Sequence, residues 1–448
     1  MPLNTPCFYS KLQTSTVLKT TTFLLFFFSF FTKEALYATD TLRMMQYNLM
    51  YYATSAPDGC NVSEESYLNN KDFNLRTIVQ YVQPDVLCVN ELGTSQTLVN
   101  RILNNVMNYN GINWYASCPL THLSYSSMIG NMLYYNTKKL AFHSHFTVIT
   151  NIRDINAYRL YYKSSSLAQG DTVFITFIIA HLKAGSGTSN EAQRAYETQQ
   201  LMSRLELIGK ADNYVFSGDF NITNSSEQCY QNLINPANTL FTFYDPLDAN
   251  GHWNNNSSFA YLHTQSTHTS AYSGECYGTG GMDDRFDFIL TSSYLKWGLR
   301  GAQALSSTYH ALGQDGNRFN GSINIPENNS IPSDVGYALY FCSDHIPVIM
   351  DFKIDANPAI VQSITEDAEL YIVNPVQDDL LQIHCYTKVP QQLEFAIYAI
   401  DGRLLDRFTQ GINVGETVID RALPYPSALY FLSVKDEHNR TITKKIIK

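Results

Sequence analysis

The sequence predicts an α/β sandwich followed by a small all-β domain, and three observations support this prediction. Between residues 41 and 352, apolar strand-like runs alternate with stretches of helical periodicity. From residue 370 to the end, only strand-like runs occur. The 448 residues also exceed the length of one typical domain. Strands mixed with helices are typical of layered α/β folds.

The α/β region begins with a strand, a helix and a second strand. Residues 41–47 form the first strand candidate, and apolar residues recur at helical spacing over 72–82, where Pro84 stops the helix. Residues 86–89 are a short apolar run that ends at Glu91. Such a run after a helix suits a buried strand.

The later elements follow the same pattern. Two strands that look like neighbours come first, and the remaining elements are four further strands and one helix. In order, the predicted ranges are strands 128–135, 142–150 and 172–180, helix 190–208, and strands 213–216, 286–290 and 346–352.

Composition indicates an ordered protein of acidic character. Hydrophobic residues make up 44% and charged residues 16%, without a signature of disorder. The net charge is −10, so electrostatic attraction alone is a poor basis for holding a nucleic acid. This charge does not exclude an enzyme that touches a few phosphates through a metal ion.

The amino terminus resembles a secretory signal peptide over residues 1–38. Residues 21–31 are an apolar run too short for a comfortable membrane span; Lys11 and Lys19 precede it and Ala38 marks the expected cleavage site. A buried helix or a membrane anchor is the alternative. No later apolar run is long enough for a stable membrane span. As a separate expectation, we predict that the protein is a monomer.

Cysteine usage is compatible with export. Cys88 and Cys342 lie in apolar strand-like contexts and are expected in the core. Four others lie in loop-like sequence, where they could pair after export: Cys60, Cys118, Cys229 and Cys276.

Polar side chains with phosphate chemistry stand beside several apolar strands. Glu91, His181 and Asp219 each end such a strand, Asp287 alternates with two phenylalanines, and Asp344 precedes another strand. Taken singly, each is better explained by a structural role, as a salt-bridge partner, a cap or a core histidine. Taken together, they match active sites that collect strand-end residues. Oxygen ligands without clustered His or Cys suit Mg²⁺, Mn²⁺ or Ca²⁺ rather than zinc.

Six short motifs occur in the order found in the endonuclease/exonuclease/phosphatase superfamily, which the chain resembles over residues 41–353. Any one motif is weak, but six in order are specific. They are Gln46-Tyr47-Asn48, Pro84-Asp85 through Glu91, Ala180-His181-Leu182, Gly218-Asp219-Phe220-Asn221, Phe286-Asp287-Phe288 and Ser343-Asp344-His345. The resemblance implies a four-layered α/β sandwich, two mixed sheets flanked by helices, for a catalytic domain over residues 39–354.

The resemblance also implies roles at matching positions. The implied metal ligands, for Mg²⁺ or else Mn²⁺ or Ca²⁺, are Asn48, Glu91 and Asp344. The implied catalytic residues are His181, Asp219, Asn221, Asp287 and His345. In these roles Asp219 positions the attacking water, Asn221 contacts the phosphate, and His345 pairs with Asp287. Which histidine is the base and which the acid stays open.

The tail resembles the C-terminal sorting domain of the bacterial type IX secretion system. The matching segments are 372–376, 397–403 and 428–431. This implies a linker over 355–368, an all-β sorting domain over 369–448, and the type IX machinery as a partner. A small immunoglobulin-like accessory domain is the alternative.

The long segment between Asp245 and Asp284 departs from a minimal version of the fold, and we expect a substrate-facing loop there. Trp253 and Phe259 would then stack on a base or cover an apolar group. An ordinary packed loop is the alternative.

These observations lead to three hypotheses on function. The first is a secreted, metal-dependent phosphodiesterase whose substrate is a nucleic acid. The second is a sphingomyelinase or an inositol-phosphate-type phosphatase on the same fold. The third, from another class, is a surface binding protein without catalysis.

Overall fold

The computed structural model describes residues 39–53, 64–123, 127–164, 167, 172–270, 278–355, 363–365, 368–372, 376 and 379–448. The predicted signal peptide, Cys60, Cys276 and most of the predicted linker lie outside the described residues. Among the residues that are described, no helix is long and apolar enough to cross a membrane.

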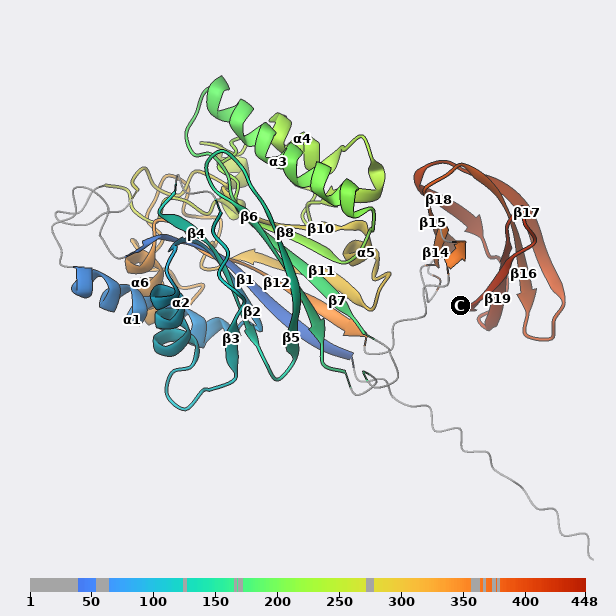
Figure 1. Cartoon of the computed structure of the whole chain (residues 1–448), viewed down its shortest axis with the longest axis horizontal. Helices are drawn as coiled ribbons and strands as arrows, with labels where there is room; N and C mark the ends of the chain where they lie inside the picture. Colours follow the sequence, from blue (N-terminus) through green and yellow to red (C-terminus); the bar gives the residue numbers. More distant parts are fainter. Residues whose placement is uncertain are drawn as a thin grey trace, which may run out of the picture. The chain divides into compact units, whose positions relative to one another are not determined.

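Two six-stranded sheets form the centre of the catalytic region (Figure 1). Both are mixed, because β1 pairs parallel with β2, and β7 parallel with β8, while their other pairings are antiparallel. The first sheet has the order β11 (Ala302–Ala311), β12 (Val348–Asp355), β1 (Thr39–Tyr52), β2 (Val86–Gly93), β4 (Ile129–Asn136) and β3 (Tyr115–Ser117). The second has the order β5 (Leu140–Val148), β6 (Ile155–Tyr162), β7 (Phe174–His181), β8 (Tyr214–Asp219), β10 (Asp287–Ser292) and β9 (Phe243–Tyr244).

One predicted pairing is wrong. The strands expected over 128–135 and 142–150 are not neighbours, because β4 lies in the first sheet and β5 at the edge of the second. Strand β4 pairs with β2 and β3, whereas β5 pairs with β6. A short connection between two strands favours a hairpin, but here it carries the chain from one sheet to the other.

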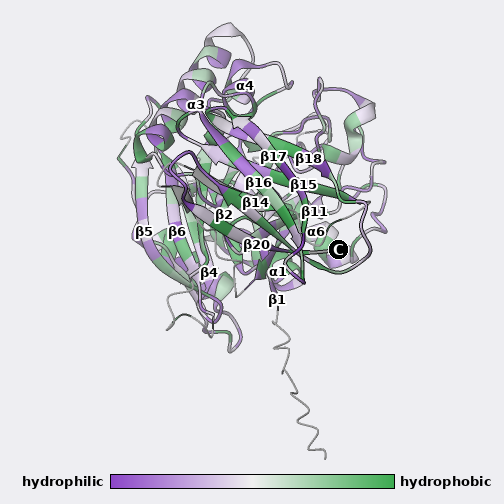
Figure 2. Cartoon of the chain, turned by 90° about the vertical axis from the view of Figure 1, so that its right-hand side faces the viewer, coloured by the Kyte–Doolittle hydropathy of each residue, from purple (hydrophilic) through white to green (hydrophobic). Residues whose placement is uncertain are grey.

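Helices cover the outer face of each sheet. On the first sheet lie α1 (Glu64–Val82), α2 (Gln96–Ile102), the π-helical turn η1 (Leu103–Met107) and α6 (Ser333–Cys342), whose apolar side chains share one core cluster with that sheet. On the second lie α3 (Thr188–Ile208) and α4 (Gln228–Ile234). Hydrophilic residues are frequent along α3 (Figure 2). The described residues also form three shorter helices: η3 (Thr239–Phe241), η4 (Ser257–Leu262) and α5 (Ser293–Trp297).

The space between the sheets is filled by apolar side chains from both. Tyr158, Leu160 and Phe177 of the second sheet belong to the same cluster as Met44 and Leu87 of the first. Non-directional burial of this kind is the main favourable contribution to folding. Helices, sheet, sheet and helices therefore form four layers, and the predicted α/β sandwich is confirmed.

The five cysteines among the described residues are buried. Cys88 and Cys342 are buried in the core, as predicted. Cys118 and Cys229 are also free and buried, so neither forms the disulfide that the sequence allowed. Cys118 does lie in a loop, directly after β3, whereas Cys229 lies in α4 and not in a loop. Burial raises the pKa of the Cys229 thiol to about 12, which leaves it in the unreactive thiol form.

The tail forms an all-β sandwich, also as predicted. One sheet has the order β13 (Ser363–Thr365), β14 (Ala368–Ile372), β15 (Leu380–Thr387) and β18 (Gly415–Ala422), and the other β17 (Leu404–Ile412), β16 (Gln391–Ala399), β19 (Leu429–Lys435) and β20 (Thr441–Ile447). Side chains from both sheets share one apolar cluster. Gly402, with φ of 81°, forms the turn between β16 and β17 that its Asp-Gly sequence favours.

Candidate active site

Three adjacent strands of the second sheet bring three predicted site residues into one row. His181 ends β7 and is the register partner of Asp219, which ends β8. Asp219 is in turn the partner of Asp287, which begins β10. The row depends on Gly218, because a Cβ at this position would lie 1.8 Å from the carbonyl oxygen of Ala180. Its φ of 143° also suits glycine alone.

The first sheet contributes Asn48, Asn90 and Glu91, which face the row of His181, Asp219 and Asp287 on the second sheet. Asn48 of β1 and Asn90 of β2 are register partners, and Glu91 follows at the end of β2. The side-chain amide nitrogen of Asn48 donates to Oε1 of Glu91 at 3.0 Å and to Oδ2 of Asp219 at 2.9 Å. Asn90 accepts a hydrogen bond from the backbone N–H of Asp219 at 3.1 Å. The two sheets are therefore joined at this end by buried polar contacts.

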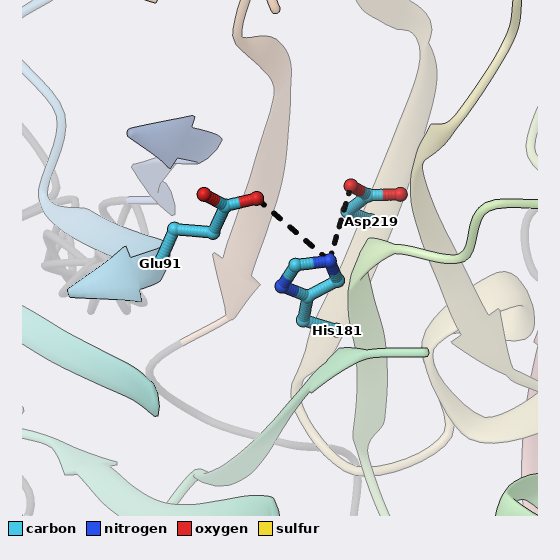
Figure 3. A group of neighbouring side chains, drawn as sticks. All are labelled: Glu91, His181 and Asp219. Atoms are coloured by element: carbon cyan, nitrogen blue, oxygen red, sulfur yellow. Dashed lines mark ion pairs between the residues drawn. The ribbon is translucent and has the colours of Figure 1, made fainter. Parts of the chain in front are cut away.

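Glu91, His181 and Asp219 point toward one another from three different strands (Figure 3). Nε2 of His181 lies 3.8 Å from Oε1 of Glu91 and 3.6 Å from Oδ2 of Asp219. One potential ligand atom from each residue lies within 4.8 Å of the others. Two of the three residues are buried, so this is a set of donors that water reaches from few directions.

The donor set fits a divalent cation. Burial raises the pKa of Asp219 to about 7, and the neighbouring Asp287 and Glu91 carboxylates add to this shift while His345 opposes it. Crowded buried carboxylates are costly without a compensating positive charge. A cation between Glu91, His181 and Asp219 would supply that charge. The two carboxylates suit Mg²⁺ or Mn²⁺, the imidazole is a donor that transition metals prefer, and the set lacks the thiolates of structural zinc.

This cluster differs from the ligand set expected from the sequence. Only Glu91 is common to both. Asn48 uses its amide nitrogen to bridge two carboxylates, and its Oδ1 accepts from the backbone N–H of Met50 at 2.8 Å. Asp344 lies on the other side of the site, where its Oδ1 is 4.0 Å from Nε2 of His345.

His345 and Asp287 form a buried pair. Nδ1 of His345 lies 2.7 Å from Oδ2 of Asp287, and both side chains are excluded from solvent. Burial by itself lowers the pKa of His345, but the Asp287 carboxylate, with Asp344 and Asp219, raises it well above its usual value. Nε2 of His345 lies 3.7 Å from Oδ2 of Asp219, so this nitrogen faces the acidic cluster.

His181 has the opposite electrostatic environment. Burial, followed by the positive charge of Arg153 and by His345, lowers the pKa of His181 well below its usual value. Its imidazole is therefore neutral, as metal ligation requires. Arg153 donates through Nε to the backbone carbonyl of His181 at 2.8 Å and so fixes the end of β7.

Asn221 lies at the rim of the same site. Its backbone N–H donates to Oδ1 of Asp219 at 2.9 Å, in a left-handed conformation with φ of 52°. Its side-chain amide nitrogen lies 3.3 Å from the carbonyl oxygen of Leu182. All eight residues predicted from the sequence are thus in contact with, or part of, one connected group.

The site contains contacts that sequence reasoning missed. Nε2 of Gln265 donates to Oδ2 of Asp344 at 3.1 Å and lies 3.0 Å from Nε2 of His345. The backbone N–H of Gly278 donates to Asp344 at 3.2 Å, and that of Tyr51 to Oε2 of Glu91 at 2.8 Å. The only signal for Gln265 was its place in the long polar segment 245–284.

That segment reaches the site through Gln265, but not through its aromatic residues. Trp253 is fully buried and donates from its indole to the carbonyl oxygen of Ala249 at 2.7 Å. Its ring packs edge-on against Phe288, and Phe259 packs against the same cluster. The expectation that Trp253 stacks on a substrate is therefore wrong, because core packing uses its surface.

The group opens into a pocket of about 300 Å³. It is lined by Met50, Tyr51, Glu91, His181, Ala184, Asp219, Asn221, Gln265, Gly278, Asp344 and His345. A larger pocket of about 650 Å³ is lined instead by residues such as Arg43, Trp114 and Lys138 and contains none of the predicted site residues. Size therefore does not identify the site, whereas the convergent carboxylates and imidazoles do.

Comparison with known proteins agrees with this geometry. A sequence model of the endonuclease/exonuclease/phosphatase family matches residues 60–345, well over half of the chain. The chain belongs to this family. Members of the endonuclease/exonuclease/phosphatase family hydrolyse phosphate esters and typically depend on a divalent metal. Within it, this chain has the acidic and imidazole donors that such chemistry requires.

Solved structures show only a distant likeness. The human nocturnin catalytic domain with bound sulfate is 16% identical, with 70% of this chain and 97% of that chain covered and a TM-score of 0.40. D. rerio TDP2 with a single-strand DNA product is 13% identical, with 70% and 98% covered and a TM-score of 0.41. An endonuclease/exonuclease/phosphatase from Beutenbergia cavernae is 13% identical, with 90% and 99% covered and a TM-score of 0.40. No curated protein matches the sequence.

Proposed function

We propose that this protein is an exported, divalent-metal-dependent phosphodiesterase whose substrate is a nucleic acid. The observation that carries the proposal is the convergence of Glu91, His181, Asp219 and the Asp287–His345 pair on one pocket from two sheets. The pocket measures about 300 Å³, and Glu91, His181, Asp219 and His345 are among the residues that line it.

The hydrolysis is assigned to the residues as follows. Nε2 of His345 takes a proton from water as the water oxygen attacks phosphorus, and the bond to the leaving ester oxygen breaks. Asp287 holds Nδ1–H of His345, which keeps Nε2 free to accept that proton. Asp219 orients the water, and Asn221 contacts a phosphate oxygen from the rim of the pocket. The metal, when bound by Glu91, His181 and Asp219, supplies positive charge for the phosphate and leaving oxygens.

The assignment of His181 follows from its surroundings. A neutral, buried imidazole is a poor proton donor but a good metal ligand or hydrogen-bond partner. We therefore place His181 beside the metal and the phosphate. The base is assigned to His345 because Asp287 holds its Nδ1 while its Nε2 faces the acidic cluster. A cation bound at that cluster would offset the carboxylates that raise the pKa of His345 and so favour the neutral imidazole that accepts a proton. Asp344, held by Gln265 and Gly278, contributes negative charge on the other side of the imidazole.

A second substrate class is favoured by the net charge. At −10, the protein repels polyanions at long range, which is less adverse for sphingomyelin, whose phosphodiester carries a choline cation. A sphingomyelinase is therefore the rival assignment on the same site. An inositol-phosphate-type phosphatase would use the same site chemistry, but its polyanionic substrate gains nothing from the net charge.

One panel of assays separates these functions. The protein is incubated with DNA, RNA, sphingomyelin and an inositol phosphate, each with Mg²⁺, Mn²⁺ or Ca²⁺, and with chelator. We expect acid-soluble nucleotides in the presence of metal, and none with chelator or in His345→Ala. Release of phosphocholine or inorganic phosphate without nucleotides would replace the nuclease assignment by its rival. Undiminished turnover of His345→Ala would refute the assignment of the base. A wild type without turnover of any substrate in any metal would favour a surface binding protein.

We also propose that the two ends of the chain direct export. Residues 1–38 have the charge and apolar pattern of a leader, and the tail has the three motif segments of a type IX sorting domain together with an apolar core of its own. Expression in a bacterium with this secretion system should place the protein outside the cell and remove the tail. Retention of full-length protein in the cytoplasm would contradict this. Sedimentation should show a monomer.

A further inference from the structure

Helix α1 contacts the backbone beside the active site through a buried lysine. Lys71 is 1% exposed, and its ammonium donates to three backbone carbonyls: those of Leu49 at 2.7 Å, Met50 at 2.8 Å and Cys342 at 2.6 Å. Leu49 and Met50 lie near the end of β1, whereas Cys342 is the last residue of α6. One side chain therefore joins two segments almost 300 positions apart in the sequence.

The first segment holds Glu91. Met50 and Tyr51 both have left-handed backbones, with φ of 44° and 57°. Such conformations cost about 1–2 kcal/mol for each ordinary residue, so other contacts must stabilise them. They aim the backbone N–H of Tyr51 at Oε2 of Glu91, 2.8 Å away. Lys71 binds the carbonyl of Met50, and the hydroxyl of Tyr67, one turn earlier on α1, lies 2.9 Å from the same oxygen.

The second segment leads into Asp344 and His345. Directly after Cys342, the Ser343 hydroxyl donates to the carbonyl oxygen of Asn48 at 2.8 Å and lies 3.2 Å from the backbone nitrogen of His345. A cation at the carboxyl end of α6 is also favoured by the helix dipole. By binding the carbonyl of Cys342, Lys71 therefore fixes the backbone three residues before the catalytic His345.

We propose that Lys71, assisted by Tyr67, is a positioning residue that sets the separation between the Glu91 side and the Asp344–His345 side of the site. This proposal rests on the proposed function. Neither residue lines the pocket, so both act through the backbone. Because a misplacement of about 1 Å can lower a rate about 10²-fold, a contact of this kind affects catalysis without touching substrate.

The chemistry of the site explains why an ammonium suits this position. Burial lowers the pKa of Lys71 to about 8, so the amine keeps its proton, and its three N–H donors, at neutral pH. Burying a charge is costly, and a methionine of similar length would fill the space at a smaller desolvation cost. What methionine cannot supply is three donors to three carbonyls.

The test compares Lys71→Met with Lys71→Arg and a matched control, Lys139→Met. Lys139 also donates to a carbonyl of β1, that of Thr41 at 2.6 Å, but at the opposite end of the strand. Three quantities are measured for each metal-stripped protein: the Mn²⁺ Kd by calorimetry, kcat and KM on the substrate found in the panel, and the unfolding midpoint.

For Lys71→Met we expect the Mn²⁺ Kd to rise and kcat to fall, each by about 10- to 100-fold, which is the range for residues that orient metal ligands. KM should change less. Lys71→Arg should recover part of both losses because it keeps the charge and donors. Lys139→Met should match the wild type in Kd and kcat.

A folded Lys71→Met with Kd and kcat within twofold of the wild type overturns the proposal. If that variant does not fold, Tyr67→Phe replaces it. We then expect smaller losses of Mn²⁺ affinity and of kcat. A Kd and a kcat equal to those of the wild type would overturn the positioning role of Lys71 and Tyr67. A wild type that binds Mn²⁺ but hydrolyses no substrate overturns only the proposed function, because the Mn²⁺ Kd still reports the role of Lys71.

Discussion

Replacing Asp287 by Asn removes one charge from the site and almost no volume. Asp287 is fully buried; its Oδ2 lies 2.7 Å from Nδ1 of His345, and its Oδ1 has no hydrogen-bond partner among the described residues. The substitution therefore tests how far this carboxylate supports the imidazole, with little confounding effect on packing.

The expected loss follows from the bond. A hydrogen bond to a charged group contributes about 1.5–3 kcal/mol. At 1.36 kcal/mol for each tenfold change, its loss lowers the rate about 10- to 150-fold. If the Asn amide donates to Nδ1, Nε2 becomes protonated and cannot accept a proton, and the loss approaches about 10⁴-fold. We therefore expect kcat to fall between about 10-fold and 10⁴-fold.

The measurement is steady-state hydrolysis at saturating metal, with the unfolding midpoint as a check on folding. KM should change little, because Asp287 does not line the pocket. The matched control is Asp351→Asn, which removes a carboxylate paired with Arg43 at 2.9 Å and outside the pocket residues. A folded Asp287→Asn with kcat within threefold of the wild type would refute the role of the pair.

Three further outcomes are expected. Gly218→Ala should destabilise the protein by about 3 kcal/mol, the upper range for overpacking, because its Cβ would meet the carbonyl oxygen of Ala180 at 1.8 Å; an unchanged denaturation midpoint would contradict this. Arg285→Met should lower the free energy of unfolding by about 3–5 kcal/mol at pH 7, because it leaves the Asp245 carboxylate buried and unpaired. Unfolding curves that coincide for the variant and the wild type would contradict this. Burial alone would raise the pKa of Asp245, but Arg285 lowers it below its unfolded value. In the wild type the stabilisation from this ion pair is therefore fully present above about pH 4, and it is lost as the pH falls through the folded pKa of Asp245. Acid unfolding of the two proteins measures this loss. Mg²⁺ at about a hundred times its Kd should stabilise the protein by about 2.7 kcal/mol, and chelator should reverse the shift; an identical melting temperature in both conditions would count against a metal site.

Several features were predictable because their signal is local. A strand-like run that ends in Glu91, His181 or Asp219 is visible in a few adjacent residues, since an apolar run marks a buried strand and a polar residue marks its end. The same holds for the Asp401-Gly402 turn and the all-β tail. Trp253 misled, because an aromatic residue in a long loop has the same composition whether it faces a substrate or the core.

By itself, the sequence determined the class of layered fold, the family and the kinds of side chain available for phosphate chemistry. Tertiary structure alone decided that His181, Asp219 and Asp287 form one row and that β4 and β5 lie in different sheets. It also decided that Lys71 joins two segments that are distant in the sequence. The reason is physical: strand pairing and backbone carbonyls and amides aimed at a site are non-local, and a lysine on a helix reads as solvent-exposed until the chain has folded around it.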